Sequence, residues 1–177
     1  MQPINIRYCF RPVRRSLATG QVADLFGLDR EETGHTVAEN VALDIRPGDV
    51  VLFTGPSGSG KSSLLRAAAE QLGAVNAMTY TLWERPLVDA LAGDLEERLS
   101  RLAACGLSEA RLLLRTPSEL SDGQRYRFRI AQALGYAQGT ESRFLMADEF
   151  AAYLDRTLAK VLSYNLRKLA TVSYTHL

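Results

Sequence analysis

The sequence predicts an α/β fold with a mostly parallel core sheet, and three consecutive stretches carry this prediction. Residues 50–54 (VVLFT) form a β-branched and aromatic run that suits a buried parallel strand. Residues 55–62 (GPSGSGKS) match every defined position of the phosphate-loop motif G-x-x-x-x-G-K-[ST]. Residues 61–72 (KSSLLRAAAEQL) then have one apolar face and a helix-favouring composition. Strand, glycine loop and helix therefore follow in the order that a phosphate-binding loop requires.

The glycine loop predicts a site for the phosphates of a nucleotide. Its glycines permit backbone conformations closed to other residues, so successive N–H groups can point at phosphate oxygens, and the following helix N-terminus adds partial positive charge. Lys61 would reach the β- and γ-phosphates, and Ser62 would bind Mg²⁺. A glycine-rich turn that matches the motif by accident is the alternative. The residues predicted to contact the nucleotide here are Gly55, Pro56, Ser57, Gly58, Ser59, Gly60, Lys61, Ser62 and Ser63.

The chain before the loop predicts a small antiparallel piece. Residues 41–45 alternate apolar and polar side chains as an edge strand does, and residues 46–49 (RPGD) predict the turn into the next strand. Residues 1–36 are the least readable part and are treated as a separate N-terminal segment. Four arginines gather there, and a solvated face accounts for them better than nucleic-acid contact does. They are Arg7, Arg11, Arg14 and Arg15.

Two further motifs lie downstream. Residues 120–124 (LSDGQ) precede a helix-like run, and their Ser-x-x-Gln spacing is that of a capping box. Residues 144–149 (FLMADE) are an apolar strand that ends in two carboxylates, Asp148 and Glu149. The carboxyl end of a strand in an α/β sheet opens onto the ligand site. The two carboxylates are therefore predicted to serve the nucleotide site rather than to cap a helix.

The remaining segments predict helices. Residues 85–120 indicate a compact arm of two helices, the second over residues 107–114, and an amphipathic helix fills residues 155–170. The leucines expected on one face of the first arm helix are Leu87, Leu91, Leu95, Leu99 and Leu102.

The order of phosphate loop, L-S-x-G-Q and strand-Asp-Glu resembles that of the ATP-binding cassette (ABC) ATPases, over roughly residues 37–170. The resemblance implies a P-loop NTPase fold, with ATP bound and hydrolysed and Mg²⁺ as the metal. It implies that Asp148 holds the Mg²⁺ shell with Ser62, and that Glu149 polarises the attacking water while Lys61 holds the phosphates. Phosphoryl transfer needs little beyond a metal, positive charge and an oriented water.

The same resemblance implies that two cassettes pair head to tail. The capped helix N-terminus at Ser121, Gly123 and Gln124 would bind the γ-phosphate of ATP held by a second subunit. The expected partners are therefore ATP and either a second copy of the chain or another cassette. Residues 150–155 occupy the place of the family's D-loop, and Asp155 matches its terminal aspartate.

Two departures from the family's pattern bear on function. Residues 77–84, where the family places a glutamine after the second core strand, contain none, and Glu84 is a guess at a substitute. Phe26 is the candidate for stacking on the adenine ring of ATP. The alternative, that Phe26 is simply buried beside Leu25, is as strongly expected. The missing glutamine and the short arm both lower the expectation of a transporter role.

The end of the chain also departs from the family. Thr175 and His176 resemble the family's switch histidine, but a helix over residues 155–170 leaves too little chain for a turn of about 2–6 residues and a strand of about 5 before it. Residues 172–177 resemble a translated sequencing adaptor and are excluded from fold reasoning as a non-native tail. The expected cassette therefore covers residues 37–171 and stops before its last core strand.

The composition limits which classes of function are expected. A net charge of +1 gives no argument for nucleic acid or a membrane surface as an obligate partner. Two cysteines, no signal peptide and no apolar run of about 20 residues predict a cytoplasmic protein that does not insert into a membrane. The leading hypothesis is a soluble cassette ATPase or a module of a longer protein. The alternatives are the ATP-binding subunit of an ABC transporter and a nucleotide-dependent dimerising module with little turnover.

Overall fold

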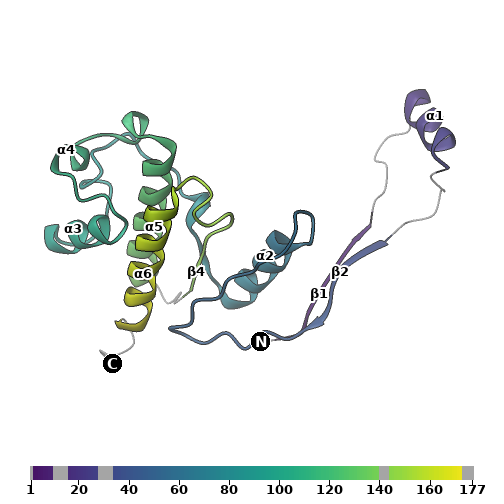
Figure 1. Ribbon diagram of the computed structural model, residues 1–177, viewed down its shortest axis with the longest axis horizontal. Coiled ribbons are helices and arrows are strands. Elements are labelled where there is room, and N and C mark those ends of the chain that lie inside the picture. Colours follow the sequence, from purple (N-terminus) through teal and green to yellow (C-terminus); the bar gives the residue numbers. More distant parts are fainter. Residues whose placement is uncertain (1, 10–15, 28–33, 140–143, 173–177) are drawn as a thin grey trace.

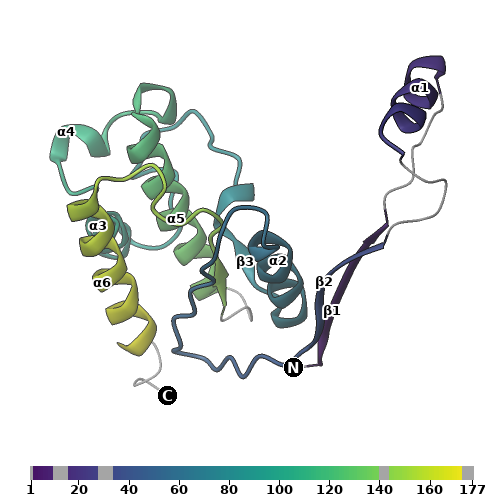
Figure 2. The ribbon, with the colours of Figure 1, turned by 45° about the vertical axis from the view of Figure 1, so that its right-hand side comes forward.

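The computed structural model describes residues 2–9, 16–27, 34–139 and 144–172. A long hairpin extends away from a body of helices, and α2 (Lys61–Leu72) is the helix of the body that lies nearest to the hairpin (Figures 1 and 2). The arrangement places the start of α2, and with it the phosphate loop, between the two parts.

The hairpin is a small antiparallel piece near the N-terminus, but it is formed by other residues than those that the sequence predicts. β1 (Ile4–Cys9) pairs with β2 (Gly34–Val41), and α1 (Leu17–Leu25) lies at the far tip without burying any of its residues (Figure 1). The expectation of a strand over residues 41–45 is wrong, because the ladder with β1 ends at Val41. The domain boundary after residue 36 stays a prediction, and it would fall inside β2.

α2 has the predicted bounds and a defined end. Gly73 follows it with φ of 60°, a left-handed conformation that glycine adopts without steric cost. The chain turns there into β3 (Val75–Asn76), which pairs in parallel with β4 (Leu145–Met146). The predicted strand before the two carboxylates is therefore present in a short form.

Residues 50–54 are not a strand in the structure, although the sequence predicts one. A strand needs a neighbour to complete its hydrogen-bond ladder, and no segment in the described ranges pairs with this run. Val50, Val51 and Leu52 are consequently 64%, 46% and 72% exposed. In the described part of the chain, parallel pairing is confined to β3 and β4.

The arm also differs from the predicted pair of helices. α3 (Leu95–Ala104) begins after Asp94, whose carboxylate accepts the Glu97 N–H at 2.9 Å in a capping box. α4 (Ala110–Leu113) is a single turn, and a short 3₁₀ helix, η2 (Pro117–Glu119), leads into the LSDGQ segment.

The prediction that five leucines share one helical face is wrong. Leu87 and Leu91 are buried but precede α3, because Gly93, with φ of 99°, interrupts the helical period. Leu95 begins the helix and is 61% exposed.

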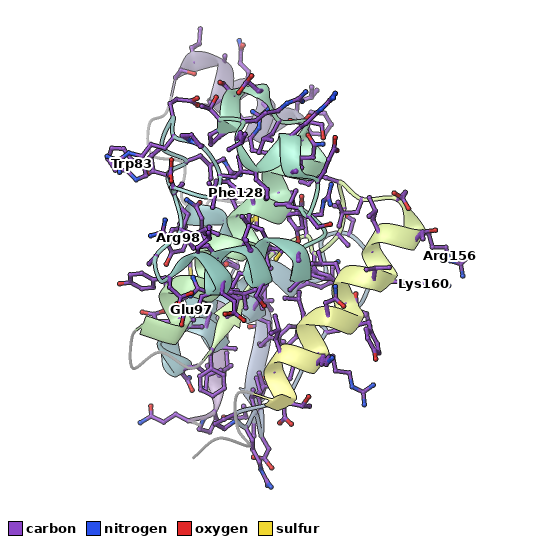
Figure 3. All side chains as sticks on the ribbon, turned by 90° about the vertical axis from the view of Figure 1, so that its left-hand side faces the viewer. Trp83, Glu97, Arg98, Phe128, Arg156 and Lys160 are labelled. Atoms are coloured by element: carbon purple, nitrogen blue, oxygen red, sulfur yellow. The ribbon has the colours of Figure 1, made fainter. Side chains whose placement is uncertain are left out.

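α5 (Asp122–Gly139) runs through the centre of the body. Phe128 on its face is fully buried and lies in the middle of the packed side chains (Figure 3). α6 (Arg156–Val172) covers one side, and the Asn165 side-chain amide donates to the Ala104 carbonyl at 2.9 Å. No helix in the described ranges combines the length and apolar character needed to cross a membrane.

Candidate phosphate site

The phosphate loop has the backbone that its glycines predict. Gly58 and Gly60 have φ of 77° and 82°, both left-handed, and the Ser59 N–H donates to the Pro56 carbonyl at 3.3 Å. α2 begins directly after Gly60, so the free N–H groups of its first turn face the loop. Such an arrangement of backbone donors at a helix N-terminus suits an anion.

Gly60 is further constrained by the hairpin. A Cβ at this position would collide with the Val37 side chain of β2, whereas a Cβ on Gly58 would meet nothing within 4 Å. Left-handed φ costs an alanine roughly 1–2 kcal/mol at either position, and overpacking adds about 1–3 kcal/mol at Gly60 alone. We therefore expect Gly60→Ala to lower the melting temperature clearly more than Gly58→Ala, as measured by calorimetry. Equal melting temperatures would show that the hairpin does not pack on the loop in solution.

Lys61 lies folded over the loop. Its ammonium donates to the Gly55 carbonyl at 2.9 Å and to the Pro56 carbonyl at 2.6 Å. An ammonium has three donors and no acceptor, so it can exchange these carbonyls for phosphate oxygens without leaving the loop. The side chain is thus placed for the role that the motif predicts.

Ser62 and Asp148 meet across 86 positions of the sequence. The Ser62 hydroxyl donates to Asp148 Oδ1 at 3.0 Å. A hydroxyl and a carboxylate are oxygen ligands of the kind that Mg²⁺ takes, and Mg²⁺ usually keeps several waters besides one or two carboxylates and substrate phosphates. The described residues contain no cluster of three or more His, Cys, Asp or Glu side chains suited to a metal, and a nucleotide-bound Mg²⁺ needs none. The pair therefore fits Mg²⁺ held jointly with phosphate oxygens.

Glu149 follows Asp148 in a strained backbone conformation. Its φ is 51°, its N–H donates to Asp148 Oδ1 at 3.0 Å, and its side chain is exposed. Ala151 is also left-handed, with φ of 64°, and the Ala152 N–H closes the turn on the Glu149 carbonyl at 3.0 Å. Left-handed non-glycine residues are uncommon, and they cluster where the surrounding structure enforces them.

The LSDGQ segment forms the predicted capping box. The Ser121 N–H donates to Gln124 Oε1 at 3.0 Å, and the Gln124 N–H donates to the Ser121 hydroxyl at 3.3 Å. Gly123 packs on residues 150–155, since a Cβ there would lie 3.0 Å from the Tyr153 carbonyl oxygen. Asp155 caps α6, and its Oδ1 accepts the Thr157 and Leu158 N–H groups.

Within the described ranges, no hydrogen bond or ion pair joins the LSDGQ segment to the phosphate loop. The structure therefore brings Lys61, Ser62 and Asp148 together, with Glu149 beside them in sequence. It leaves Ser121 and Gly123 outside this group.

Arg127 ties the LSDGQ segment to the arm. Its Nε donates to the Gly123 carbonyl at 3.2 Å, and its Nη1 donates to the Gly106 carbonyl. Burial lowers the pKa of this guanidinium, and electrostatic interactions with Cys105 and Asp155 oppose that effect. A buried arginine of this kind fixes the start of α5 relative to the arm.

Two guessed residues lie away from the loop. Phe26 is the C-cap residue of α1, the helix at the far tip of the hairpin (Figure 1), and it is 69% exposed, so the structure does not bring it to the phosphate loop. Glu84 accepts the Ser118 hydroxyl at 2.9 Å, and in the described residues no hydrogen bond links it to Ser62 or Asp148. His176 lies outside the described residues.

Sequence reasoning missed Tyr8. Its hydroxyl donates to the Ser63 hydroxyl at 2.7 Å, which ties β1 to the first turn of α2. No motif signals this contact, because it depends on how the hairpin lies against the loop.

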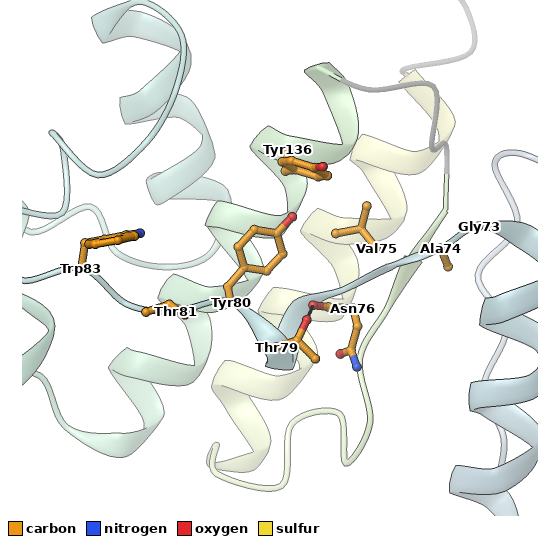
Figure 4. Close-up of a pocket in the computed structure, with 9 residues that line it drawn as sticks. All are labelled: Gly73, Ala74, Val75, Asn76, Thr79, Tyr80, Thr81, Trp83 and Tyr136. Carbon is orange, nitrogen blue, oxygen red and sulfur yellow. Dashed lines mark hydrogen bonds between the residues drawn. The ribbon is translucent and has the colours of Figure 1, made fainter.

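A separate pocket lies beside β3. Its walls include the edge-to-face rings of Tyr80 and Tyr136, whose centroids are 5.7 Å apart, and Trp83, which is 67% exposed (Figure 4). Burial raises the pKa of Tyr80. The pocket is lined by none of the residues that the motifs select.

Comparison with known proteins agrees with the motifs. The family model described as ABC transporter matches residues 38–79. The aliphatic sulfonates import ATP-binding protein SsuB 1 of Rhodococcus jostii is 34% identical over 139 residues, which cover 63% of this chain and 56% of that protein. The protein of the same name from Streptomyces avermitilis is 31% identical over 157 residues, with coverages of 79% and 59%.

A third relative is the sulfate/thiosulfate import ATP-binding protein CysA of Halalkalibacterium halodurans. It is 30% identical over 172 residues, which cover 73% of this chain and 46% of that protein. The chain spans about half the length of the curated relatives it matches.

Proposed function

This chain belongs to the ABC transporter family of ATP-binding proteins, and on that premise we propose that it binds MgATP and hydrolyses it to ADP and phosphate. The observation that carries the proposal is the Ser62–Asp148 contact at 3.0 Å, directly after Lys61, whose ammonium lies on the loop carbonyls. Two motifs that are remote in sequence thereby supply the oxygen ligands and the positive charge that phosphoryl transfer requires.

The residues have distinct roles in this proposal. The N–H groups of the loop and of the first turn of α2 bind phosphate oxygens, and Lys61 neutralises charge on the β- and γ-phosphates. Ser62 and Asp148 would hold the metal, which when bound would neutralise charge on the phosphate oxygens. Glu149 accepts a hydrogen bond from the attacking water and orients it, and Lys61 stabilises the charge that develops.

The Asp148→Asn variant tests this assignment. Asparagine keeps an oxygen that can accept the Ser62 and Glu149 hydrogen bonds, but it loses the charge that attracts Mg²⁺. We expect Mg²⁺ to tighten ATP binding by the wild type. In the variant this gain in affinity should be about tenfold smaller, a loss of roughly 1.4 kcal/mol.

Calorimetric ATP titrations with and without Mg²⁺ measure the effect. Ser100→Ala, an exposed change on α3, is the control and should behave as wild type. The same Mg²⁺ dependence in Asp148→Asn and wild type would contradict the metal assignment.

The proposal includes a mostly parallel core sheet of the P-loop NTPase type. β3 and β4, which pair in parallel, would belong to that sheet, and the family match over residues 38–79 supports it. In the described residues β4 pairs with β3 alone, so a further strand could pair along its other edge.

The proposal also includes head-to-tail pairing of two cassettes and a cytoplasmic location. Ser121 and Gly123 lie at the capped N-terminus of α5, a position suited to phosphate, yet no contact joins them to the loop of their own chain in the described ranges. A second cassette would bring them to ATP. ATP-dependent dimerisation of Glu149→Gln, measured by light scattering, tests this pairing.

A second candidate function is the ATP-binding subunit of a transporter. The relatives are named as import ATP-binding proteins, and this observation favours it. Purification with an associated membrane protein would support this role. A cassette that hydrolyses ATP without any such partner would support the soluble alternative.

A further inference from the structure

Residues 149–154 form a tight, strained turn that needs support from outside itself. Glu149 and Ala151 are both left-handed, and each such residue costs roughly 1–2 kcal/mol. Within the turn, the Ala152 N–H donates to Glu149 and the Leu154 N–H donates to Ala151, both at 3.0 Å. These local bonds close the turn, but they do not fix it relative to the body.

Tyr126 supplies a contact that does fix it. This residue lies on α5, two positions after Gln124, and it is only 3% exposed. Its hydroxyl oxygen accepts the Ala151 N–H at 3.0 Å. Its ring lies 5.8 Å from that of Tyr153, at an interplanar angle of 47°. The side chain thus reaches the turn with both its ring and its hydroxyl.

We propose that Tyr126 is a positioning residue for Glu149. By accepting the Ala151 N–H, its hydroxyl holds the left-handed turn that sets the direction of the Glu149 carboxylate. The inference rests on the proposed ATPase function. It adds a connection from α5 to the carboxylate that orients the attacking water.

The chemistry of the hydroxyl fits this role. Burial raises the pKa of Tyr126, so the group stays a neutral hydroxyl at ordinary pH, and its oxygen keeps a lone pair for the amide. The Ala151 N–H is partly buried, and an N–H that loses its acceptor costs up to about 1–3 kcal/mol when it is fully buried. Because the turn is already strained, it would relax to another backbone conformation rather than carry that cost as well.

The test compares Tyr126→Phe with Tyr153→Phe. The first keeps the buried ring and removes only the acceptor for Ala151. The second removes a hydroxyl from a neighbouring ring that is 59% exposed. We expect Tyr126→Phe to lower kcat about ten- to hundredfold, as misorientation of a reacting group does, with ATP affinity unchanged within about twofold. Tyr153→Phe should keep the wild-type kcat.

Hydrogen exchange of the Ala151 amide provides a readout independent of turnover. Measured by NMR, it should be faster in Tyr126→Phe than in wild type and unchanged in Tyr153→Phe, with similar melting temperatures for all three proteins. Unchanged exchange in Tyr126→Phe would overturn the proposal, because it would show that the wild type does not form the hydrogen bond between Tyr126 and Ala151. Faster exchange with unchanged kcat would overturn it because the bond would not position Glu149.

The two proposals fail in different ways. A folded wild type that releases no phosphate contradicts the ATPase function itself. An active wild type whose kcat is insensitive to Tyr126→Phe contradicts only the role of Tyr126.

Discussion

Lys61→Ala is expected to abolish measurable ATP binding while leaving the fold intact. In the described part of the chain the ammonium makes two hydrogen bonds, both to carbonyls of its own loop, so its removal leaves no other described element unsupported. Hydrogen bonds to charged groups contribute about 1.5–3 kcal/mol each. Losing two of them to the phosphates should weaken affinity by a factor of at least about a hundred.

Calorimetric titration with MgATP measures this loss. Lys160→Ala is the matched control, because Lys160 is an exposed lysine that points outward from α6 (Figure 3). It should bind ATP as wild type does. A folded Lys61→Ala protein with wild-type affinity for ATP would show that Lys61 does not bind the phosphates.

Glu149→Gln is expected to bind ATP and fail to hydrolyse it. Glutamine keeps the size and the hydrogen-bonding capacity of the side chain but cannot act as a base or polarise water by charge. Loss of such a group lowers the rate by about 10²–10⁴-fold. Affinity should stay near the wild-type value, because the carboxylate is exposed and makes no contact with the loop in the described residues.

Steady-state phosphate release, together with an ATP titration, separates the two effects. Glu96→Gln is the control, since Glu96 is an exposed glutamate in the first turn of α3. It should leave both quantities unchanged. Equal turnover in Glu149→Gln and wild type would mean that Glu149 shapes the turn and takes no part in the chemistry.

Local features could be predicted from the sequence because neighbouring residues determine them. The bounds of α2 follow from the phosphate-loop motif before it and from Gly73 after it, and the capping box of Ser121 and Gln124 follows from their spacing. The proximity of Asp148 to the loop could be anticipated as well, because a strand delivers its last side chains to the sheet edge where the loop lies.

Contacts between distant segments could not be predicted. The Tyr8–Ser63 and Tyr126–Ala151 hydrogen bonds depend on how the hairpin and α5 lie against their neighbours, and no periodicity encodes this. The left-handed φ of Glu149 has no sequence signal either, since glutamate does not favour it.

The missing strand over residues 50–54 has a related cause. The composition of residues 50–54 suits a buried strand, but a β-ladder forms only where a neighbouring strand can pair. In the described ranges that neighbour is absent, and the apolar side chains are exposed instead. The helical spacing of the arm leucines was likewise not enough to predict one continuous helix, because Gly93 interrupts it.

Phosphate release from ATP by the purified wild-type chain, measured with Mg²⁺ and with Mg²⁺ removed by a chelator, tests the proposed ATPase activity. We expect release that requires Mg²⁺, is lost in Lys61→Ala, and is lost in Glu149→Gln although ATP remains bound. Release that persists without Mg²⁺ or in both variants would contradict it, and so would a wild type that binds MgATP and releases no phosphate.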